Sequence, residues 1–160
     1  MYDVAVIGCG IVGAAAAYEL SRYNCRVLVL EAKNDVANVT TKANSAILHA
    51  GYDPTPGTLM AETNVRGVAL AKELCEKLDV EREEIGSLVL AFGEEDERHL
   101  EKLYQQGLAN GVPGIELLTA DEVHALEPNV SDKVTAALYA PTAAIVSPWE
   151  YALALAETAV

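Results

Sequence analysis

A glycine-rich turn near the start of the sequence constrains the fold more than any other feature. The segment Gly8–Gly13 (G-C-G-I-V-G) follows a short apolar run, Asp3–Ile7, and opens an alanine-rich stretch, Ile11–Tyr23. A second apolar run, Arg26–Leu30, comes next. Short apolar runs bounded by glycine are typical of buried parallel strands, and strand, helix and strand in this order form a βαβ unit with a right-handed crossover. We therefore predict two parallel strands, buried on both faces and joined by a helix.

The GxGxxG spacing of this turn has a physical reason at each glycine. Gly8 permits the tight turn, Gly10 lets a pyrophosphate approach the backbone, and Gly13 lets the helix pack closely on the strand. The N-terminus of the helix offers unpaired N–H groups and a positive dipole to phosphates. Glu31, at the end of the second apolar run, can accept hydrogen bonds from ribose hydroxyls. The sequence thus predicts a dinucleotide site.

The choice of dinucleotide depends on fewer residues. An acid at Glu31 disfavours NADP, because it would repel the 2′-phosphate. NAD and FAD share the fingerprint, so both fit it. The long polar loop Ala32–Asn44 that follows is common in flavoproteins and favours FAD modestly, which leaves a nicotinamide-binding module as an alternative.

The rest of the chain is predicted to alternate between helices and short strands. Asn44–Tyr52 is ambiguous, and the prolines and glycine of Asp53–Gly57 indicate a turn. N-capping residues, hydrophobic periodicity and Asn-Gly stops define the remaining elements. The predicted helices are Thr58–Leu78, Glu94–Asn110, Thr119–Leu126 and a last one that starts at Ser147-Pro148, and the predicted strands are Ser87–Phe92, Ile115–Leu118 and Val134–Tyr139.

Charge and cysteine content narrow the class of partner. Lys and Arg number 11 against 24 Asp and Glu, a formal net charge of −13, which argues against nucleic acid or an anionic membrane surface as partner. No apolar stretch approaches the roughly 20 residues of a membrane span, and no basic segment of a signal peptide is present. Cys9, Cys25 and Cys75 form no CxxC pair, and no spacing resembles a metal site. We expect reduced, mostly buried thiols, no metal and a cytoplasmic location.

A later stretch resembles a known flavoprotein family. Thr40–Tyr52 (TTKANSAILHAGY) contains N-S-x-x-x-H-x-G, which resembles a stretch of the D-amino-acid-oxidase-like superfamily of FAD-dependent oxidoreductases. Within it, the likeness is to the L-2-hydroxyglutarate dehydrogenase/oxidase and FAD-dependent glycerol-3-phosphate dehydrogenase group, and it covers nearly the whole chain. Further segments similar in order and spacing are Gly86–Ala91, Asn110–Gly114, Glu127-Pro128 and Thr142–Ser147.

The resemblance implies an α/β fold, in which a Rossmann-like FAD-binding βαβ unit is joined to part of an α+β substrate domain. Residues 1–80 would form the N-terminal segment of the FAD domain, 81–144 part of the substrate domain, and 145–160 a helix that returns to the FAD domain. Members of the family are longer than 160 residues, so the fold is incomplete relative to the family. The segment His49-Ala50-Gly51 has Ala where relatives often have Ser.

The resemblance also implies roles for individual residues. The ADP half of FAD would be held around the glycine turn and the end of the second strand, the pyrophosphate or ribityl region would meet the polar loop, and His49 would lie near the isoalloxazine ring. The implied cofactor contacts are Gly8, Gly10, Ile11, Val12, Gly13, Glu31 and Ala32, followed by Thr41, Asn44 and Ser45.

His49 also has a plausible task on chemical grounds. Oxidation of a CH–OH group requires the hydroxyl proton to leave as hydride moves, and imidazole titrates in the useful range. The alternative interpretation is a hydrogen-bonded core or loop histidine. We therefore predict an FAD-dependent dehydrogenase or oxidase for a small anionic substrate, either glycerol 3-phosphate or a 2-hydroxy acid, with His49 as base; an amine substrate is the weaker choice.

The length of the chain leaves a further alternative open. Two strands alone cannot build a parallel sheet that binds a ligand across a switch point. The chain by itself is therefore expected to be incomplete as an enzyme. It would otherwise be an inactive nucleotide-binding fragment that self-associates through its unpaired strands.

Overall fold

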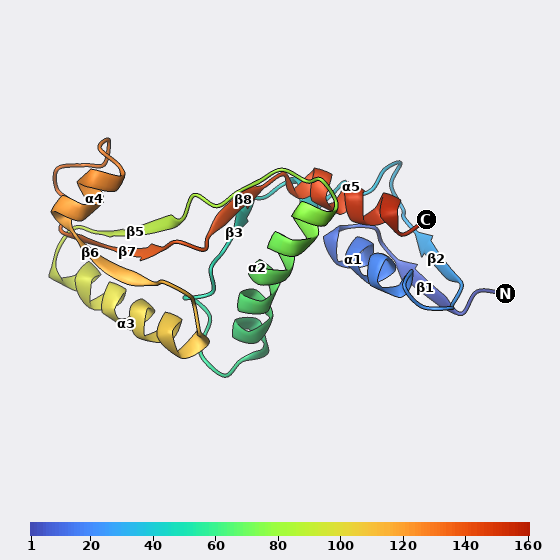
Figure 1. Cartoon of the computed structure of the whole chain (residues 1–160), viewed down its shortest axis with the longest axis horizontal. Helices are drawn as coiled ribbons and strands as arrows, with labels where there is room; N and C mark the ends of the chain where they lie inside the picture. The colour runs from blue at the N-terminus through green and yellow to red at the C-terminus, as the bar shows by residue number, and fades with distance from the viewer. The chain divides into compact units, whose positions relative to one another are not determined.

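The computed structural model describes all 160 residues and divides them into two compact units. Figure 1 shows the helices and strands of both. Each unit is formed by segments that are far apart in the sequence. The first consists of Met1–Ala46, Glu73–Arg82 and Val146–Val160, and the second of Ile47–Lys72 and Glu83–Ile145.

The boundaries of the two units differ from those of the predicted domains mainly in one segment. Residues 47–72, which the sequence analysis placed in the cofactor domain, are grouped with 83–145 in the second unit. Helix α2 (Leu59–Lys77) contributes residues to both units. The assignment of a cofactor role to 1–80 and 145–160, and of a substrate role to 81–144, stays a prediction.

The first unit contains the predicted βαβ motif. Strand β1 (Val4–Ile7) leads into helix α1 (Ile11–Leu20), and strand β2 (Val27–Leu30) returns parallel to β1. Helix α5 (Pro148–Thr158) packs on α1. The α/β fold class and the order strand, helix, strand are thus confirmed. The buried residues that form the core of this unit are Cys9, Ala14, Tyr18 and Leu155.

Tyr18 joins this core to α2. Its ring is buried, and its hydroxyl oxygen accepts hydrogen bonds from Lys77 Nζ at 2.8 Å and Arg22 Nη2 at 3.3 Å. These two cations, Lys77 first, lower the pKa of Tyr18. Tyr151 of α5 lies in the same core without such partners, and burial raises its pKa to about 12.

One prediction for β1 and β2 was wrong. The sequence pattern indicated burial on both faces, but β1 alternates between half-buried and exposed residues, and Ile7 is 86% exposed. The side chain of Val6 faces α1, as its 3.4 Å distance from the Cβ position of Gly13 shows. Successive side chains of a strand point to opposite faces. Ala5 and Ile7 therefore lie on the face that α1 leaves uncovered.

The second unit is built around an antiparallel sheet in the order β5-β7-β6. Strand β7 (Ala136–Ala140) lies in the middle, between β5 (Ser87–Ala91) and β6 (Glu116–Thr119). Helices α3 (Glu94–Asn110) and α4 (Ala120–Leu126) pack against this sheet. All of these elements were predicted, with the strand ends shifted by one or two residues.

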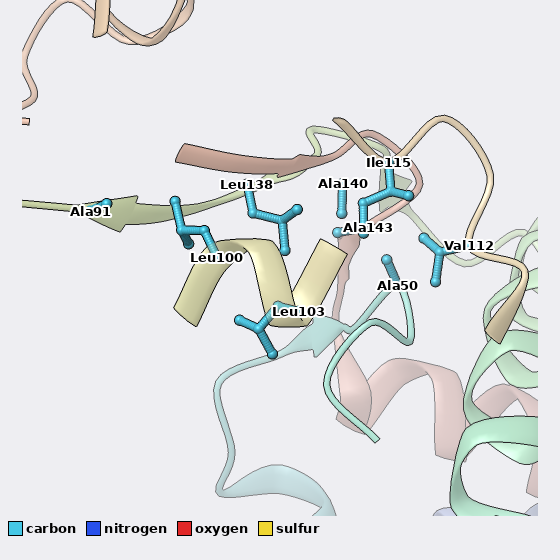
Figure 2. Packing of buried hydrophobic residues seen from close by; sticks show 9 residues of the cluster. All are labelled: Ala50, Ala91, Leu100, Leu103, Val112, Ile115, Leu138, Ala140 and Ala143. Atoms are coloured by element: carbon cyan, nitrogen blue, oxygen red, sulfur yellow. The ribbon is translucent and has the colours of Figure 1, made fainter. Parts of the chain in front are cut away.

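Alternating side chains give this sheet two separate cores. Leu138 of β7 belongs to the cluster with Leu100 and Leu103 of α3, and Figure 2 shows Leu100 beside Leu138. The neighbouring β7 residue, Ala137, instead packs with Val123 of α4. The apolar character of β7 at every position is thus explained by a helix on each face.

Three short strands complete the structure. Strand β3 (Ile47–Leu48) pairs antiparallel with β8 (Ala144–Val146), and β4 (Arg82–Glu83) is the third strand of that sheet. A single turn of 3₁₀ helix, η1 (Thr40–Lys42), lies within the predicted polar loop. None of the helices combines the length and the apolar character needed to span a membrane.

Candidate functional site

The glycine turn adopts the geometry that the fingerprint predicts. Gly8 has φ +94°, a left-handed conformation that favours glycine. A Cβ atom added at Gly13 would lie 2.0 Å from the carbonyl oxygen of Gly8, so α1 approaches the end of β1 more closely than any side chain allows. Gly8 and Gly13 therefore fix where α1 begins relative to β1.

The N-terminus of α1 is left open to a ligand on one side. Gly10 is the N-cap residue, and because it has no side chain it cannot accept hydrogen bonds from the first N–H groups of the helix. Thr41 Oγ1 accepts a hydrogen bond from the Ile11 N–H at 3.0 Å. A Cβ atom at Gly10 would lie 3.0 Å from that same oxygen. The structure thus places Thr41, a residue of η1, next to the glycine turn. The predicted contact of Thr41 with the cofactor stays a prediction.

Glu31 is tied directly to the glycine turn, which the sequence analysis did not foresee. Its Oε2 accepts from the Cys9 N–H at 2.8 Å, and its Oε1 accepts from the Lys33 N–H at 2.8 Å. The hydrogen bond from Cys9, followed by that from Lys33, lowers the pKa of the Glu31 carboxyl. An ionised carboxylate has about four lone-pair sites, so Glu31 keeps acceptor capacity for ribose hydroxyls.

This arrangement predicts a specific acid sensitivity of Glu31. Because the folded pKa lies below the ordinary value of 4.5, the carboxylate stabilises the fold above that value and loses this contribution as the pH falls through the folded pKa. Glu31→Gln should therefore be less stable than the parent at pH 7, and this difference should shrink as the pH is lowered below 4.5. Urea unfolding followed by fluorescence of Trp149, the single tryptophan, measures this difference.

A matched control for this prediction is Glu116→Gln, an exposed position of β6 in the second unit. It should leave the unfolding of the first unit unchanged at each pH at which Glu31→Gln is measured. A destabilisation by Glu31→Gln that does not shrink at any pH below 4.5 at which both proteins are folded would show that the hydrogen bonds to the ionised carboxylate are not its cause.

Asn44 stabilises the polar loop from within. Its Nδ2 donates to the carbonyl oxygens of Thr41 at 2.7 Å and Thr40 at 3.2 Å, while its Oδ1 accepts from the Ala46 N–H at 2.8 Å. Ala46 has φ 63°, a strained conformation for a residue with a side chain. Asn44 thus shapes the loop.

The cofactor contacts predicted at Ser45, Ala32 and Val12 lie at exposed positions.

His49 belongs to the second unit, whereas the glycine turn, Glu31 and Thr41 belong to the first. The side chain of His49 is exposed and follows β3 directly. It borders a cavity of about 170 Å³ within the second unit. The other residues that line this cavity, which the sequence analysis did not single out, are Gly51, Tyr52, Asp53, Pro54, Met60 and Asn64.

None of the three cysteines is paired in the structure, and Cys9 and Cys75 are buried, whereas Cys25 is half-buried. Their reduced state stays a prediction. Burial, with a smaller contribution from Glu31, raises the pKa of the Cys9 thiol. Although Cys9 lies inside the fingerprint, its side chain therefore packs in the core of the first unit as an inert thiol.

A parallel βαβ unit with this glycine turn, an open helix N-terminus and an acid at the end of β2 has the architecture of a dinucleotide-binding protein. Comparison with known families agrees with this class. The model of the family described as "FAD dependent oxidoreductase" matches residues 3–160. The chain belongs to this family of FAD dependent oxidoreductases.

Individual relatives are similar over nearly the whole chain. A glycerol 3-phosphate dehydrogenase of Caloramator mitchellensis is 52% identical over 160 residues, which are 100% of this chain and 33% of the relative. A mitochondrial L-2-hydroxyglutarate dehydrogenase of Dictyostelium discoideum is 34% identical over 149 residues, 91% of this chain and 33% of the relative. The chain therefore spans about a third of the length of these relatives.

A solved structure is similar in fold as well. It is dithionite-reduced L-alpha-glycerophosphate oxidase from Mycoplasma pneumoniae with FAD bound, with a TM-score of 0.91 and 34% identity over 99% of this chain and 42% of that chain. The predicted superfamily and the predicted group within it are thus confirmed, and at the level of the family so is FAD as cofactor. The predicted cytoplasmic location and self-association stay predictions.

Proposed function

We propose that this chain supplies the ADP-binding part of an FAD site, and a proton-accepting histidine, to an oxidoreductase that oxidises the CH–OH group of a small anionic substrate. The observation that carries the proposal is the glycine turn, where Gly13 has no room for a Cβ atom and the N-cap Gly10 has no side chain to cover the helix N-terminus. The family match and the 52% identity to a glycerol 3-phosphate dehydrogenase support it.

The residues of the first unit fit the ADP part of FAD. The N-terminus of α1 offers N–H groups and a positive dipole end to a pyrophosphate, and the absence of a side chain at Gly10 keeps the backbone accessible. The Thr41 hydroxyl, which accepts from the Ile11 N–H, has its own proton free to donate to a phosphate oxygen. Glu31, kept ionised by the Cys9 and Lys33 N–H groups, accepts from ribose hydroxyls.

In this proposal the second unit supplies the acid–base chemistry. FAD, when bound, supplies the acceptor for the hydride. The His49 imidazole accepts the proton of the substrate hydroxyl, because an alcohol carbon releases hydride readily only as its oxygen loses that proton. The exposed side chain of His49, beside a cavity that also has Asp53 and Asn64 in its wall, is accessible to a substrate.

Glycerol 3-phosphate is the substrate that the similarity favours over a 2-hydroxy acid. The relative named for glycerol 3-phosphate is 52% identical, and the one named for L-2-hydroxyglutarate is 34% identical. Both names describe small anions with a CH–OH group. Specificity between them requires differential contacts to phosphate or carboxylate, so a direct comparison of substrates is needed.

The experiment is a titration of the purified chain with FAD, followed by flavin absorbance and fluorescence, with NAD⁺ and NADP⁺ as competitors. We expect saturable FAD binding, weaker binding of NAD⁺ and none of NADP⁺. The FAD-loaded protein is then mixed anaerobically with glycerol 3-phosphate, L-2-hydroxyglutarate or glycine, and bleaching of the flavin is recorded. Preference for NAD⁺ would favour a nicotinamide-binding module, and binding of neither by the folded chain would contradict the proposal.

A further inference from the structure

The loop that carries His49 is held by a side chain far away in the sequence. The segment 49–54, named here the histidine loop, has no regular secondary structure. Asn110, the last residue of α3, donates from Nδ2 to the carbonyl oxygen of Gly51 at 2.9 Å and to that of Pro54 at 2.8 Å. Gly51 and Pro54 are buried, and a buried carbonyl group without a partner is costly. Asn110 therefore satisfies two acceptors that no strand or helix supplies with donors.

Two further amides continue this pattern along the loop. Gln106, one helical turn before Asn110, donates from Nε2 to the carbonyl oxygen of Asp53 at 3.0 Å and to that of Tyr52 at 3.3 Å. Asn64 of α2 donates from Nδ2 to the carbonyl oxygen of His49 itself. Side-chain amides thus bind five of the six carbonyl groups of the histidine loop, and two residues of α3 bind four of them.

Close packing reinforces the same contact. A Cβ atom at Gly107, between the two α3 amides, would lie 3.1 Å from Tyr52 Cβ and 2.3 Å from Ile115 Cδ1. A Cβ atom at Gly51, which has φ +108°, would lie 2.6 Å from Val65 Cγ2. The histidine loop is therefore enclosed between α3 and α2 at both of these glycines, and it has little freedom to change its path.

We propose that Asn110, assisted by Gln106, is a positioning residue that sets the direction of the His49 side chain through the histidine loop. The inference deepens the proposed function, because it names what holds the proton-accepting histidine in place. Asn110 itself touches neither substrate nor cofactor in this scheme. A loop fixed at Gly51 and Pro54 on one side, and at His49 by Asn64 on the other, holds the backbone from which the His49 imidazole extends beside its cavity.

The test uses the three histidines of the chain as internal probes. Labelling histidine with ¹³C at the ring Cε1 atom alone gives one NMR signal each for His49, His99 of α3 and His124 of α4. Asn110→Asp keeps the size of the side chain and removes its donors, so it faces carbonyl oxygens with a carboxylate. We expect the His49 ring signal to shift or to split, while the signals of His99 and His124 stay where they are.

A second variant and a matched control keep this test decisive. Asn110→Ala removes the donors without adding charge, and it should also shift or split the His49 signal. It replaces Asn110→Asp in the test if the added carboxylate prevents folding. Gln105→Ala alters the neighbouring amide, which contacts Glu101 on the helix surface, and should leave all three signals unchanged. Unchanged His49 signals in both Asn110 variants, or equal changes in all three histidines, would overturn the proposal.

The flavin assay separates this inference from the proposed function. In FAD-loaded protein, Asn110→Ala should slow flavin reduction by about tenfold or more at saturating substrate, as misplacement of a reacting group does, with little change in FAD affinity. If the parent protein binds no FAD, the proposed function fails, while the NMR signal of His49 still decides whether Asn110 positions it.

Discussion

His49→Gln is expected to slow the reduction of bound flavin by glycerol 3-phosphate by about 10²–10⁴-fold, the usual contribution of a positioned general base. Glutamine retains hydrogen-bonding groups, but it cannot take up a proton near neutral pH. FAD affinity should stay close to that of the parent, because the glycine turn, Glu31 and Thr41 lie in the other unit. Anaerobic stopped-flow absorbance, recorded over a range of substrate concentrations, separates the rate of reduction from substrate binding.

The control for this substitution is His99→Gln, which alters an exposed histidine of α3 in the same unit as His49. In this variant the bound flavin should be reduced by substrate at the same rate as in the parent. If His49→Gln also stays within about twofold of the parent, far from the effect of a lost base, His49 is a loop histidine and another group must take the proton. That outcome would leave the cofactor assignment of the first unit intact.

Local sequence signals were sufficient wherever an element is defined by its own ends. Helix α3 begins in an acidic first turn and stops at Gly111, whose φ of +77° is a left-handed cap. The capping box between Thr119 and Glu122 is present, and Ser147 caps α5 through the Glu150 N–H. Each of these signals acts within four residues, so the sequence alone carries it.

The short strands could not be predicted, because their partners are distant. Strand β3 has only two residues, and its pairing of Ile47 with Ile145 depends on a contact across most of the chain. The prediction that β1 is buried on both faces was wrong for a related reason. An apolar run such as that of β1 indicates that both faces can be buried, but it does not tell which element covers the face of Ala5 and Ile7.

In the candidate site, too, local features were predicted and contacts between distant residues were missed. The dinucleotide-binding role of the glycine turn and Glu31 was predicted from their spacing, because each of these residues suits a particular part of a dinucleotide. The hydrogen bond from the Cys9 N–H to Glu31 was missed, since the spacing suggested only ribose as its partner. Asn110 was interpreted as a helix stop together with Gly111, and nothing local indicated that its amide reaches Gly51 and Pro54.

Gly13→Ala should have the largest effect on the first unit. The new Cβ atom would lie 2.0 Å from the Gly8 carbonyl oxygen and 3.0 Å from its carbon, and a methyl group has no rotamer that avoids them. Alanine favours a helix over glycine by about 1 kcal/mol, but overpacking against a backbone costs about 1–3 kcal/mol or more, so destabilisation wins. Helix α1 must move away from β1, and its N–H groups move with it. We expect FAD affinity to fall by about 10–10²-fold, because hydrogen bonds to a charged group contribute about 1.5–3 kcal/mol and about 1.4 kcal/mol is tenfold in affinity.

Gly67→Ala isolates the helix propensity from the clash. Gly67 is a glycine of α2 with no atom within 4 Å of its Cβ position, so alanine there should stabilise by roughly 0.5–1 kcal/mol and leave FAD binding unchanged. Urea unfolding followed by the fluorescence of Trp149, a residue of α5, and FAD titration give both quantities for each variant. Helix α5 packs on α1, so the signal reports on the first unit. A Gly13→Ala protein as stable as the parent that still binds FAD would mean that α1 and β1 can separate without loss of the site. The close approach at Gly13 would then not be what fixes the dinucleotide-binding turn.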